Sequence, residues 1–126
     1  MTVNNNEDEK IVYKKLSYEI VGILFDVYNT LGYGHPEKYY EGAIEVALMH
    51  KKILFDRQKY FRLTYQHKPI GKYYLDFLVD NNIVLELKRA RHFSKRNIEQ
   101  IKGYLQATNL KLAILANFTP TGVKTY

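Results

Sequence analysis

The chain has 126 residues and a mass of 14.9 kDa, and it is 46% hydrophobic and 25% charged, which indicates one compact globular domain rather than a disordered or collagen-like chain. It has no cysteine, so disulfides, thiolate zinc sites, iron–sulfur clusters and a cysteine nucleophile are excluded. No apolar run approaches the ~20 residues of a membrane span, and the first residues do not resemble a signal peptide. We therefore expect a cytoplasmic protein with no membrane partner.

The net charge of +6 is unevenly distributed along the chain. Residues 1–45 hold four basic and eight acidic residues, a net charge of −4, whereas residues 46–126 hold fifteen basic and five acidic residues, a net charge of +10. A basic segment suggests a polyanionic partner, most commonly nucleic acid. A solvated basic surface that keeps the protein soluble is the alternative, and charge alone favours neither.

In chain order, the pattern predicts two helices before any strand. Apolar residues at three- and four-residue spacings indicate a helix from Leu16 to Leu31, with Gly32 as its stop. Gly34-His35-Pro36 then interrupts the chain. Because proline suits the first position of a helix, we expect a second helix from Pro36 to about Lys51.

The pattern then changes from the helical period to alternation. The predicted strands are Lys59–Tyr65, Tyr73–Val79, Ile83–Lys88 and the apolar Lys111–Phe118. Asp80-Asn81-Asn82 is expected to form the turn between the second and third strands. Ser94 is a suitable N-cap for a helix over Lys95–Thr108. The predicted order is α-α-β-β-β-α-β, an α/β sandwich, with residues 1–12 as a polar, flexible tail and 13–126 as a single domain.

The hairpin formed by the second and third strands carries the most informative polar residues. If its turn is centred on Asn81, Asp76 lies opposite Glu86, with Cβ atoms ~5 Å apart, where like charges are destabilising. Lys88 projects from the same face as Glu86. The other face is predicted to be an unbroken apolar surface of Leu75, Phe77, Val79, Ile83, Leu85 and Leu87. Unpaired charges on strands that otherwise appear buried are costly, so something must compensate them.

A divalent cation would compensate this pair of carboxylates. Carboxylate oxygens are hard ligands suited to Mg²⁺ or Mn²⁺, which also take phosphate oxygens of a substrate. Such a metal would orient and acidify an attacking water and neutralise charge on the phosphate, while Lys88 could hold that water or the transition-state anion. The alternative is that Lys88 simply pairs with Asp76 or Glu86, since an Asp followed by E-x-K is common by chance.

Other polar residues could join this cluster. Gln100 and Tyr104 are four residues apart on one helix face and could reach the carboxylates if that helix packs over them; a surface Gln and a half-buried Tyr are the alternative. Glu37 and Glu41, in the first turns of the second helix, either satisfy the helix dipole or share a cation with the cluster. The basic residues that follow Lys88 lead into a helix N-terminus and either bind phosphate or form a solvated loop. They are Arg89, Arg91, His92, Lys95 and Arg96.

Together these residues resemble the PD-(D/E)XK nuclease superfamily, and specifically its small group of GxxExxY proteins. The group's name motif is present as Gly34 through Tyr40, and the nuclease motif as Asp76 followed by Glu86-Leu87-Lys88. The later Q-x-x-x-Y motif is present as Gln100 through Tyr104. The similarity extends over roughly Leu16 to Phe118, although Leu75 replaces the proline that usually precedes the aspartate.

The resemblance implies a restriction-endonuclease-like αβββαβ core with one extra N-terminal helix, and a Mg²⁺- or Mn²⁺-dependent nuclease acting on DNA without sequence specificity or by recognising its structure. It implies Asp76, Glu86 and Glu37 as metal ligands, Lys88 as the catalytic lysine, and Gln100 and Tyr104 as supporting residues. The expected nucleic-acid contacts are Arg89, Arg91, Lys95, Arg96 and Tyr40. A homodimer is expected. The alternatives are a catalytically inactive nucleic-acid-binding module and a homodimeric accessory protein with the same fold.

Overall fold

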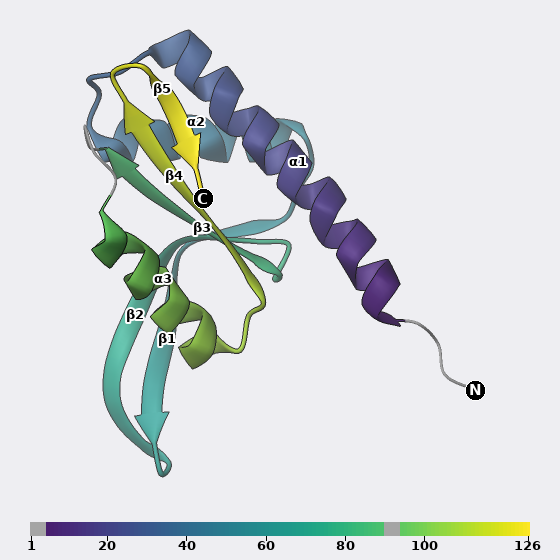
Figure 1. Ribbon diagram of the computed structural model, residues 1–126, viewed down its shortest axis with the longest axis vertical. Coiled ribbons are helices and arrows are strands. Elements are labelled where there is room, and N and C mark those ends of the chain that lie inside the picture. Colours follow the sequence, from purple (N-terminus) through teal and green to yellow (C-terminus); the bar gives the residue numbers. More distant parts are fainter. Residues whose placement is uncertain (1–4, 90–93) are drawn as a thin grey trace.

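The computed structural model describes residues 5–89 and 94–126, which form three helices and five strands (Figure 1). In chain order these are α1 (Asn5–Leu31), α2 (Glu37–His50), β1 (Phe55–Tyr65), β2 (Lys68–Val79), β3 (Ile83–Arg89), α3 (Lys95–Thr108), β4 (Leu112–Thr119) and β5 (Gly122–Thr125). The predicted order of elements is confirmed up to β4. The short strand β5 was not predicted, because four residues are too few to show an alternating pattern.

Most helix ends lie at or next to the predicted residues, and local hydrogen bonds explain why. α1 ends at Leu31, and the next residue, Gly32, has a φ of 71° that favours glycine and an N–H that donates to the carbonyl of Tyr28 at 2.7 Å. The Oγ of Ser94 caps α3 by accepting the N–H of Arg96 at 3.1 Å. α1, however, begins at Asn5 rather than Leu16. Residues 5–12 are therefore helical, and the predicted tail is shorter than expected. The sequence pattern missed them because apolar spacing marks only the stretch of a helix that packs on a core, not how far the helix continues.

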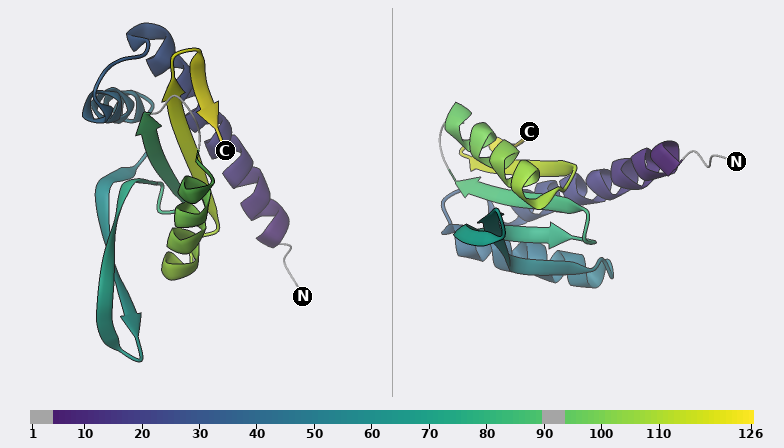
Figure 2. Two further views of the ribbon diagram at one scale, coloured as in Figure 1. Left: turned by 60° about the vertical axis from the view of Figure 1, so that its left-hand side comes forward. Right: turned by 90° about the horizontal axis from the view of Figure 1, so that it is seen from below.

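Strands β1 and β2 are longer than predicted and form a hairpin that projects from the rest of the domain (Figure 1; Figure 2, left). β1 begins at Phe55 rather than Lys59, and β2 begins at Lys68 rather than Tyr73. The strands are joined by the two-residue turn Gln66-His67, in which both residues have positive φ. Residues 68–72, which lead out of this turn, are all exposed, so they lack the apolar alternation on which the strand predictions rested.

The sheet has the order β1-β2-β3-β4-β5 and is antiparallel except where β3 and β4 run parallel. A parallel pair needs a crossover connection, and α3 lies in the segment that provides it. The set α2-β1-β2-β3-α3-β4 forms the predicted αβββαβ core, and α1 is the predicted extra N-terminal helix. The mixed α/β architecture is consistent with a restriction-endonuclease-like fold.

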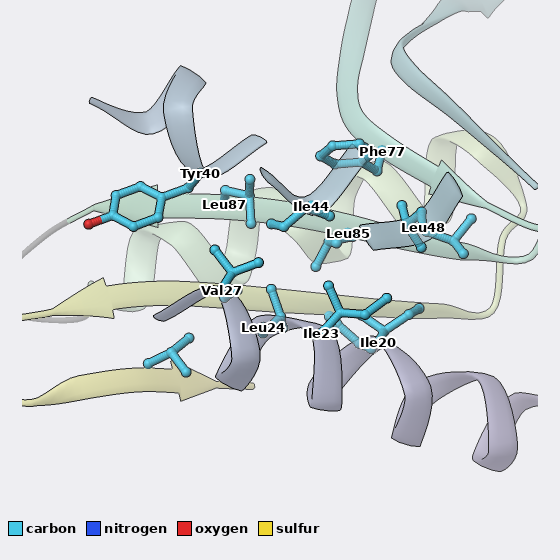
Figure 3. Packing of buried hydrophobic residues seen from close by; sticks show 14 of the residues in the cluster. Ile20, Ile23, Leu24, Val27, Tyr40, Ile44, Leu48, Phe77, Leu85 and Leu87 are labelled. Carbon is cyan, nitrogen blue, oxygen red and sulfur yellow. The ribbon is translucent and has the colours of Figure 1, made fainter. Parts of the chain in front are cut away.

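Helices cover both faces of the sheet (Figure 2, right). α1 and α2 pack on one face, where Ile20, Ile23 and Leu24 meet Phe77, Leu85 and Leu87 around Ile44 and Leu48 (Figure 3). α3 packs on the other face over a smaller cluster centred on Leu75, Leu78 and Val84. Among the described residues, no helix is long and apolar enough to cross a membrane.

Candidate active site

The turn between β2 and β3 fixes the register of the candidate site. Asp80 and Asn81 have φ of 51° and 57°, and the N–H of Asn82 donates to the carbonyl of Val79 at 3.0 Å, so the turn is centred as predicted. Val79 pairs with Ile83, and Phe77 pairs with Leu85. Continuing the same register places Asp76 opposite Glu86, which confirms the predicted juxtaposition of these residues.

At Asp76 and Glu86 the side chains take over hydrogen bonds that backbone carbonyls would otherwise accept. The backbone pairing of β2 with β3 ends at Phe77 and Leu85. Beyond it, the N–H of Asp76 donates to Oε1 of Glu86 at 2.8 Å, and the N–H of Leu87 donates to Oδ2 of Asp76 at 2.8 Å. The two carboxylates therefore connect the strands where the regular ladder stops.

The pairing of β1 with β2 is also interrupted at Asp76. The residues on either side of Gln58 and Asp76 are paired, but these two are not, and Gln58 has a φ of 54°. The amide of Gln58 donates to Oε1 of Glu41 at 2.9 Å and to Oδ1 of Asp76 at 3.4 Å. Gln58 thus connects the candidate site to α2.

The same irregularity corrects one prediction about the sheet. Leu75 was expected on the apolar face with Phe77, but it packs with Leu78 and Val84 on the opposite face. Residues two apart on a regular strand share a face, so the alternation must change between Leu75 and Phe77, which is where Asp76 lies. The predicted apolar face is correct for its other five members, Phe77, Val79, Ile83, Leu85 and Leu87.

Glu86 is buried beside another carboxylate, and no ion-pair partner for it lies among the described residues. Its residue is 6% exposed, and its pKa is raised from 4.5 to about 8, first by burial and then by the negative charge of Asp76. The positive charge of Lys88 opposes this shift but is the weakest of the contributing causes. Among the described side chains, those of residues 13–89 and 94–126, no basic group lies within 4.0 Å of either carboxylate. The simple ion pair with Lys88 that the sequence left open is therefore not formed.

α3 brings one of its two predicted residues to the site. Tyr104 is half-buried, and its pKa is raised by burial first and then by the charges of Glu86 and Asp76. Its ring packs edge-on against Tyr73 of β2, with centroids 4.6 Å apart. Gln100 is exposed, and in the described part of the chain it makes no hydrogen bond with either carboxylate.

The acidic residues of α2 lie beside the site and have partners of their own. Oε1 of Glu37 accepts the N–H of Arg89 at 3.1 Å, which ties the start of α2 to the end of β3. Oε1 of Glu41 lies 3.6 Å from Arg57, which also contacts Glu45 at 2.6 Å. Arg57 thus neutralises part of the acidic face of α2.

The predicted metal ligands are assembled in part. Among the residues that the structure describes, no three His, Asp or Glu side chains gather closely enough to hold a metal ion. Asp76 and Glu86 lie together, whereas Glu37 is bonded to the backbone of Arg89. Two adjacent carboxylates still fit Mg²⁺ or Mn²⁺, because these ions are commonly held by one or two carboxylates, with water and phosphate oxygens completing the shell.

The predicted nucleic-acid contacts divide into exposed basic residues and one buried tyrosine. Arg89, Lys95 and Arg96 are exposed, and the guanidinium of Arg89 lies 5.3 Å from the ring centroid of Tyr33. Arg91 lies outside the described residues. The prediction for Tyr40 is wrong.

Tyr40 belongs to the core rather than to a binding surface. It is 0% exposed, its ring stacks on Phe118 with centroids 4.3 Å apart, and its hydroxyl donates to the carbonyl of Gly32. Helical periodicity explains the error, because Tyr40 lies on the same face of α2 as the buried Ile44 and Leu48.

Sequence reasoning missed two residues that shape the site. Gln58 bridges Glu41 and Asp76, and Tyr73 supports Tyr104. Nothing in the sequence marks Gln58, since its importance depends on a positive φ in the middle of a strand. Tyr73 was recognised as part of a strand, but its contact with α3 depends on how that helix crosses the sheet.

The fold and the site together define a class: a restriction-endonuclease-like α/β domain with an aspartate and an E-x-K motif on adjacent strands. A model of the PD-(D/E)XK nuclease superfamily matches residues 14–126, and the chain belongs to this superfamily. No curated protein and no solved structure matches the chain. Membership points to nuclease activity and a nucleic-acid substrate, while the GxxExxY group remains a prediction.

Proposed function

We propose that this protein is a nuclease that uses Mg²⁺ or Mn²⁺ to hydrolyse phosphodiester bonds in DNA, by structure or without specificity rather than by sequence. The observation that supports this most is the pairing of the buried Glu86 with the half-buried Asp76, two carboxylates that have no ion-pair partner among the described residues. Burial of an uncompensated charge is costly, so such a pair is retained where a cation or a reaction requires it.

Each residue of the site has a role in this proposal. Asp76 and Glu86 hold the divalent ion, with Glu37 as a further carboxylate from α2. When bound, such an ion supplies an acidified water and neutralises charge that develops on the phosphate. Lys88 projects from β3 two residues after Glu86 and stabilises the attacking water or the developing anion. Tyr104 and Gln100 position the substrate or the lysine from α3.

The direct test is a cleavage panel of single-stranded, duplex, flapped and four-way DNA with Mg²⁺ or Mn²⁺. Wild-type protein should cut at least one of these substrates, and EDTA should abolish cutting. Glu86→Gln and Lys88→Ala should each lower the rate by at least about 100-fold. Lys124→Ala, at an exposed position on β5, serves as the matched control and should cut as the wild type does. Cleavage that survives Glu86→Gln or EDTA contradicts the proposal.

A second measurement separates the nuclease from a binding module that has lost catalysis. Calorimetric titration of wild-type protein with Mn²⁺ should show heat that Glu86→Gln abolishes. Salt-sensitive DNA binding without such heat and without cleavage would instead identify a non-catalytic nucleic-acid-binding protein.

We also propose that the protein acts as a homodimer, because a domain of this size offers little surface to a duplex. Light scattering on a gel-filtration column should give twice the chain mass of 14.9 kDa. A monomer mass at the concentrations used for cleavage contradicts this part of the proposal.

A further inference from the structure

The projecting part of the β1–β2 hairpin has an unusual composition. We call residues 59–75 the arm; its outer part extends beyond α3, away from the other helices and from β3 and β4 (Figure 1; Figure 2, left). No acidic residue occurs between Asp56 and Asp76 in the sequence. The arm's basic residues are Lys59, Arg62, Lys68 and Lys72, and its tyrosines are Tyr60, Tyr65, Tyr73 and Tyr74.

The arm has one partly covered face and one open face. On the covered face, Tyr73 contacts Tyr104 of α3, and Phe61 packs on the cluster that contains Leu75. Because side chains alternate along a strand, the residues next to Phe61 in β1 and next to Tyr73 in β2 point to the opposite side. Four exposed residues of that side, which we call the arm face, are Tyr60, Arg62, Lys72 and Tyr74.

Two tyrosines of the arm face form an exposed aromatic pair. Tyr60 and Tyr74 are direct cross-strand partners, with ring centroids 5.4 Å apart and exposed fractions of 42% and 50%. The ammonium of Lys72 lies 5.9 Å from the centroid of Tyr74. Exposed tyrosines beside a cation form the kind of surface on which unpaired bases stack, because every base presents a π face.

The two basic residues of the arm face are also direct cross-strand partners. Arg62 lies opposite Lys72, and like charges in this position destabilise a sheet. In the described part of the chain, no carboxylate lies within 4.0 Å of either side chain. An anion bound between Arg62 and Lys72 would relieve this repulsion. It would lie next to Tyr60 and Tyr74 along the same face, because only one cross-strand pair separates the two pairs.

We propose that the arm face binds single-stranded nucleic acid, with bases stacked on Tyr60 and Tyr74 and phosphates held by Arg62 and Lys72. The inference rests on the proposed function and adds a substrate class to it: strands with an unpaired segment. A duplex is disfavoured as the ligand of this surface, because the faces of its bases are already stacked on one another and are not available to Tyr60 and Tyr74.

Binding is measured by fluorescence anisotropy in EDTA, so that cleavage plays no part. The probes are a labelled oligo(dT) of about 20 nucleotides and a duplex of the same length. Tyr60→Ala/Tyr74→Ala should weaken oligo(dT) binding by at least about tenfold and duplex binding by less than about threefold. Tyr18→Ala/Phe25→Ala removes two exposed aromatic residues of α1 and should leave both affinities unchanged.

The basic pair is tested through the salt dependence of the same binding. Arg62→Gln/Lys72→Gln should reduce the slope of log K against log salt for oligo(dT) by about 1.4, since each lost single-strand phosphate contact removes about 0.7. Lys14→Gln/Lys15→Gln, at exposed positions of α1, should leave the slope unchanged. Circular dichroism melting shows whether each variant is folded under the conditions of the assay.

Unchanged oligo(dT) binding in both folded arm variants overturns the inference, and so does an equal loss of duplex binding in the tyrosine variant. These results are independent of catalysis. A Glu86→Gln variant that still cleaves contradicts the proposed nuclease but not the arm, whereas arm variants that bind normally contradict the arm but not the nuclease.

Discussion

Glu86 combines three properties that a surface carboxylate does not have together. It is almost fully buried, it lies beside Asp76, and it accepts a hydrogen bond from the backbone of the strand that carries Asp76. Burial and the neighbouring charge favour the protonated form, whereas the backbone hydrogen bond favours the ionised one, and burial dominates. In the absence of a cation, the ionised form of this residue therefore opposes folding.

This balance predicts how stability depends on pH in EDTA. Because the pKa of Glu86 rises from 4.5 to about 8 on folding, the folded state holds a proton that the unfolded state has lost between these values. The free energy of unfolding of the wild type should therefore fall, relative to that of Glu86→Gln, as pH rises from about 4.5 to 8. Urea denaturation at several pH values measures this difference. A constant difference across that range contradicts the prediction.

Tyr40 leads to a prediction about stability rather than binding. Tyr40→Phe removes the hydroxyl that donates to the Gly32 carbonyl but keeps the ring on Phe118, so it should cost about 1–3 kcal/mol. DNA affinity, measured in EDTA, should not change. Tyr39→Phe, which alters an exposed tyrosine on the same helix, is the control and should change stability by less than about 0.5 kcal/mol. Urea denaturation compares the variants.

The interruption in the pairing of β1 with β2 at Gln58 affects which way the side chains of both strands point. It coincides with the change of face in β2, and it gives Gln58 the reach to contact α2 and Asp76 together. An irregular residue that reorients side chains is common in strands beside functional sites. Because of its positive φ, position 58 should therefore accept few other residue types without a loss of stability.

Two substitutions separate the backbone of Gln58 from its side chain. Gln58→Val places a β-branched residue at a φ of 54° and should lower the free energy of unfolding by about 1–3 kcal/mol. Gln58→Asn tolerates this φ and should lie closer to the wild type, even though the shorter side chain loses reach. Urea denaturation of both variants tests the idea, which fails if the two are equally stable.

In the molecule as a whole, the sheet face covered by α1 and α2 is packed more tightly than the face covered by α3. α1 and α2 bury a large cluster that includes fully buried residues from both helices, whereas α3 has no fully buried residue. An apolar groove of about 190 Å³ lies beside α3, lined by Ile98, Ile101, Lys102, Leu105, Ala113, Leu115 and Tyr126. α3 is therefore the less firmly held layer of the domain.

Native-state hydrogen exchange should show this difference. Amides of α3 should have protection factors at least about tenfold lower than amides of β3 and β4, which corresponds to an opening free energy lower by about 1.4 kcal/mol. Leu24→Ala, in the large cluster, should cost about 2–5 kcal/mol in global stability. Leu105→Ala, in the half-buried stripe of α3, should lower the free energy of unfolding by less than Leu24→Ala does. Equal protection in α3 and the central strands contradicts this view of the molecule.

The sequence predicts the parts of this fold in which burial and local chemistry agree. The core strands alternate, Gly32 and Ser94 mark helix ends, and Asn81 centres a turn, so these features and the opposition of Asp76 and Glu86 were predictable. The strand at residues 68–72 in the outer part of the arm was not, because these residues are all exposed and show no burial pattern. Gln58 was not predictable either, since its contact depends on a backbone conformation that glutamine rarely adopts.

Since Asp76 and Glu86 each accept an N–H of the opposing strand, two backbone amides sense the state of the site directly. Those of Asp76 and Leu87 lie 2.8 Å from carboxylate oxygens, so any change of charge on these oxygens alters the electron density at the amide protons. In a ¹H–¹⁵N spectrum, these two resonances should shift when Mg²⁺ is added. Occupancy of the site is thus expected to be readable in a protein that has been given no substrate at all.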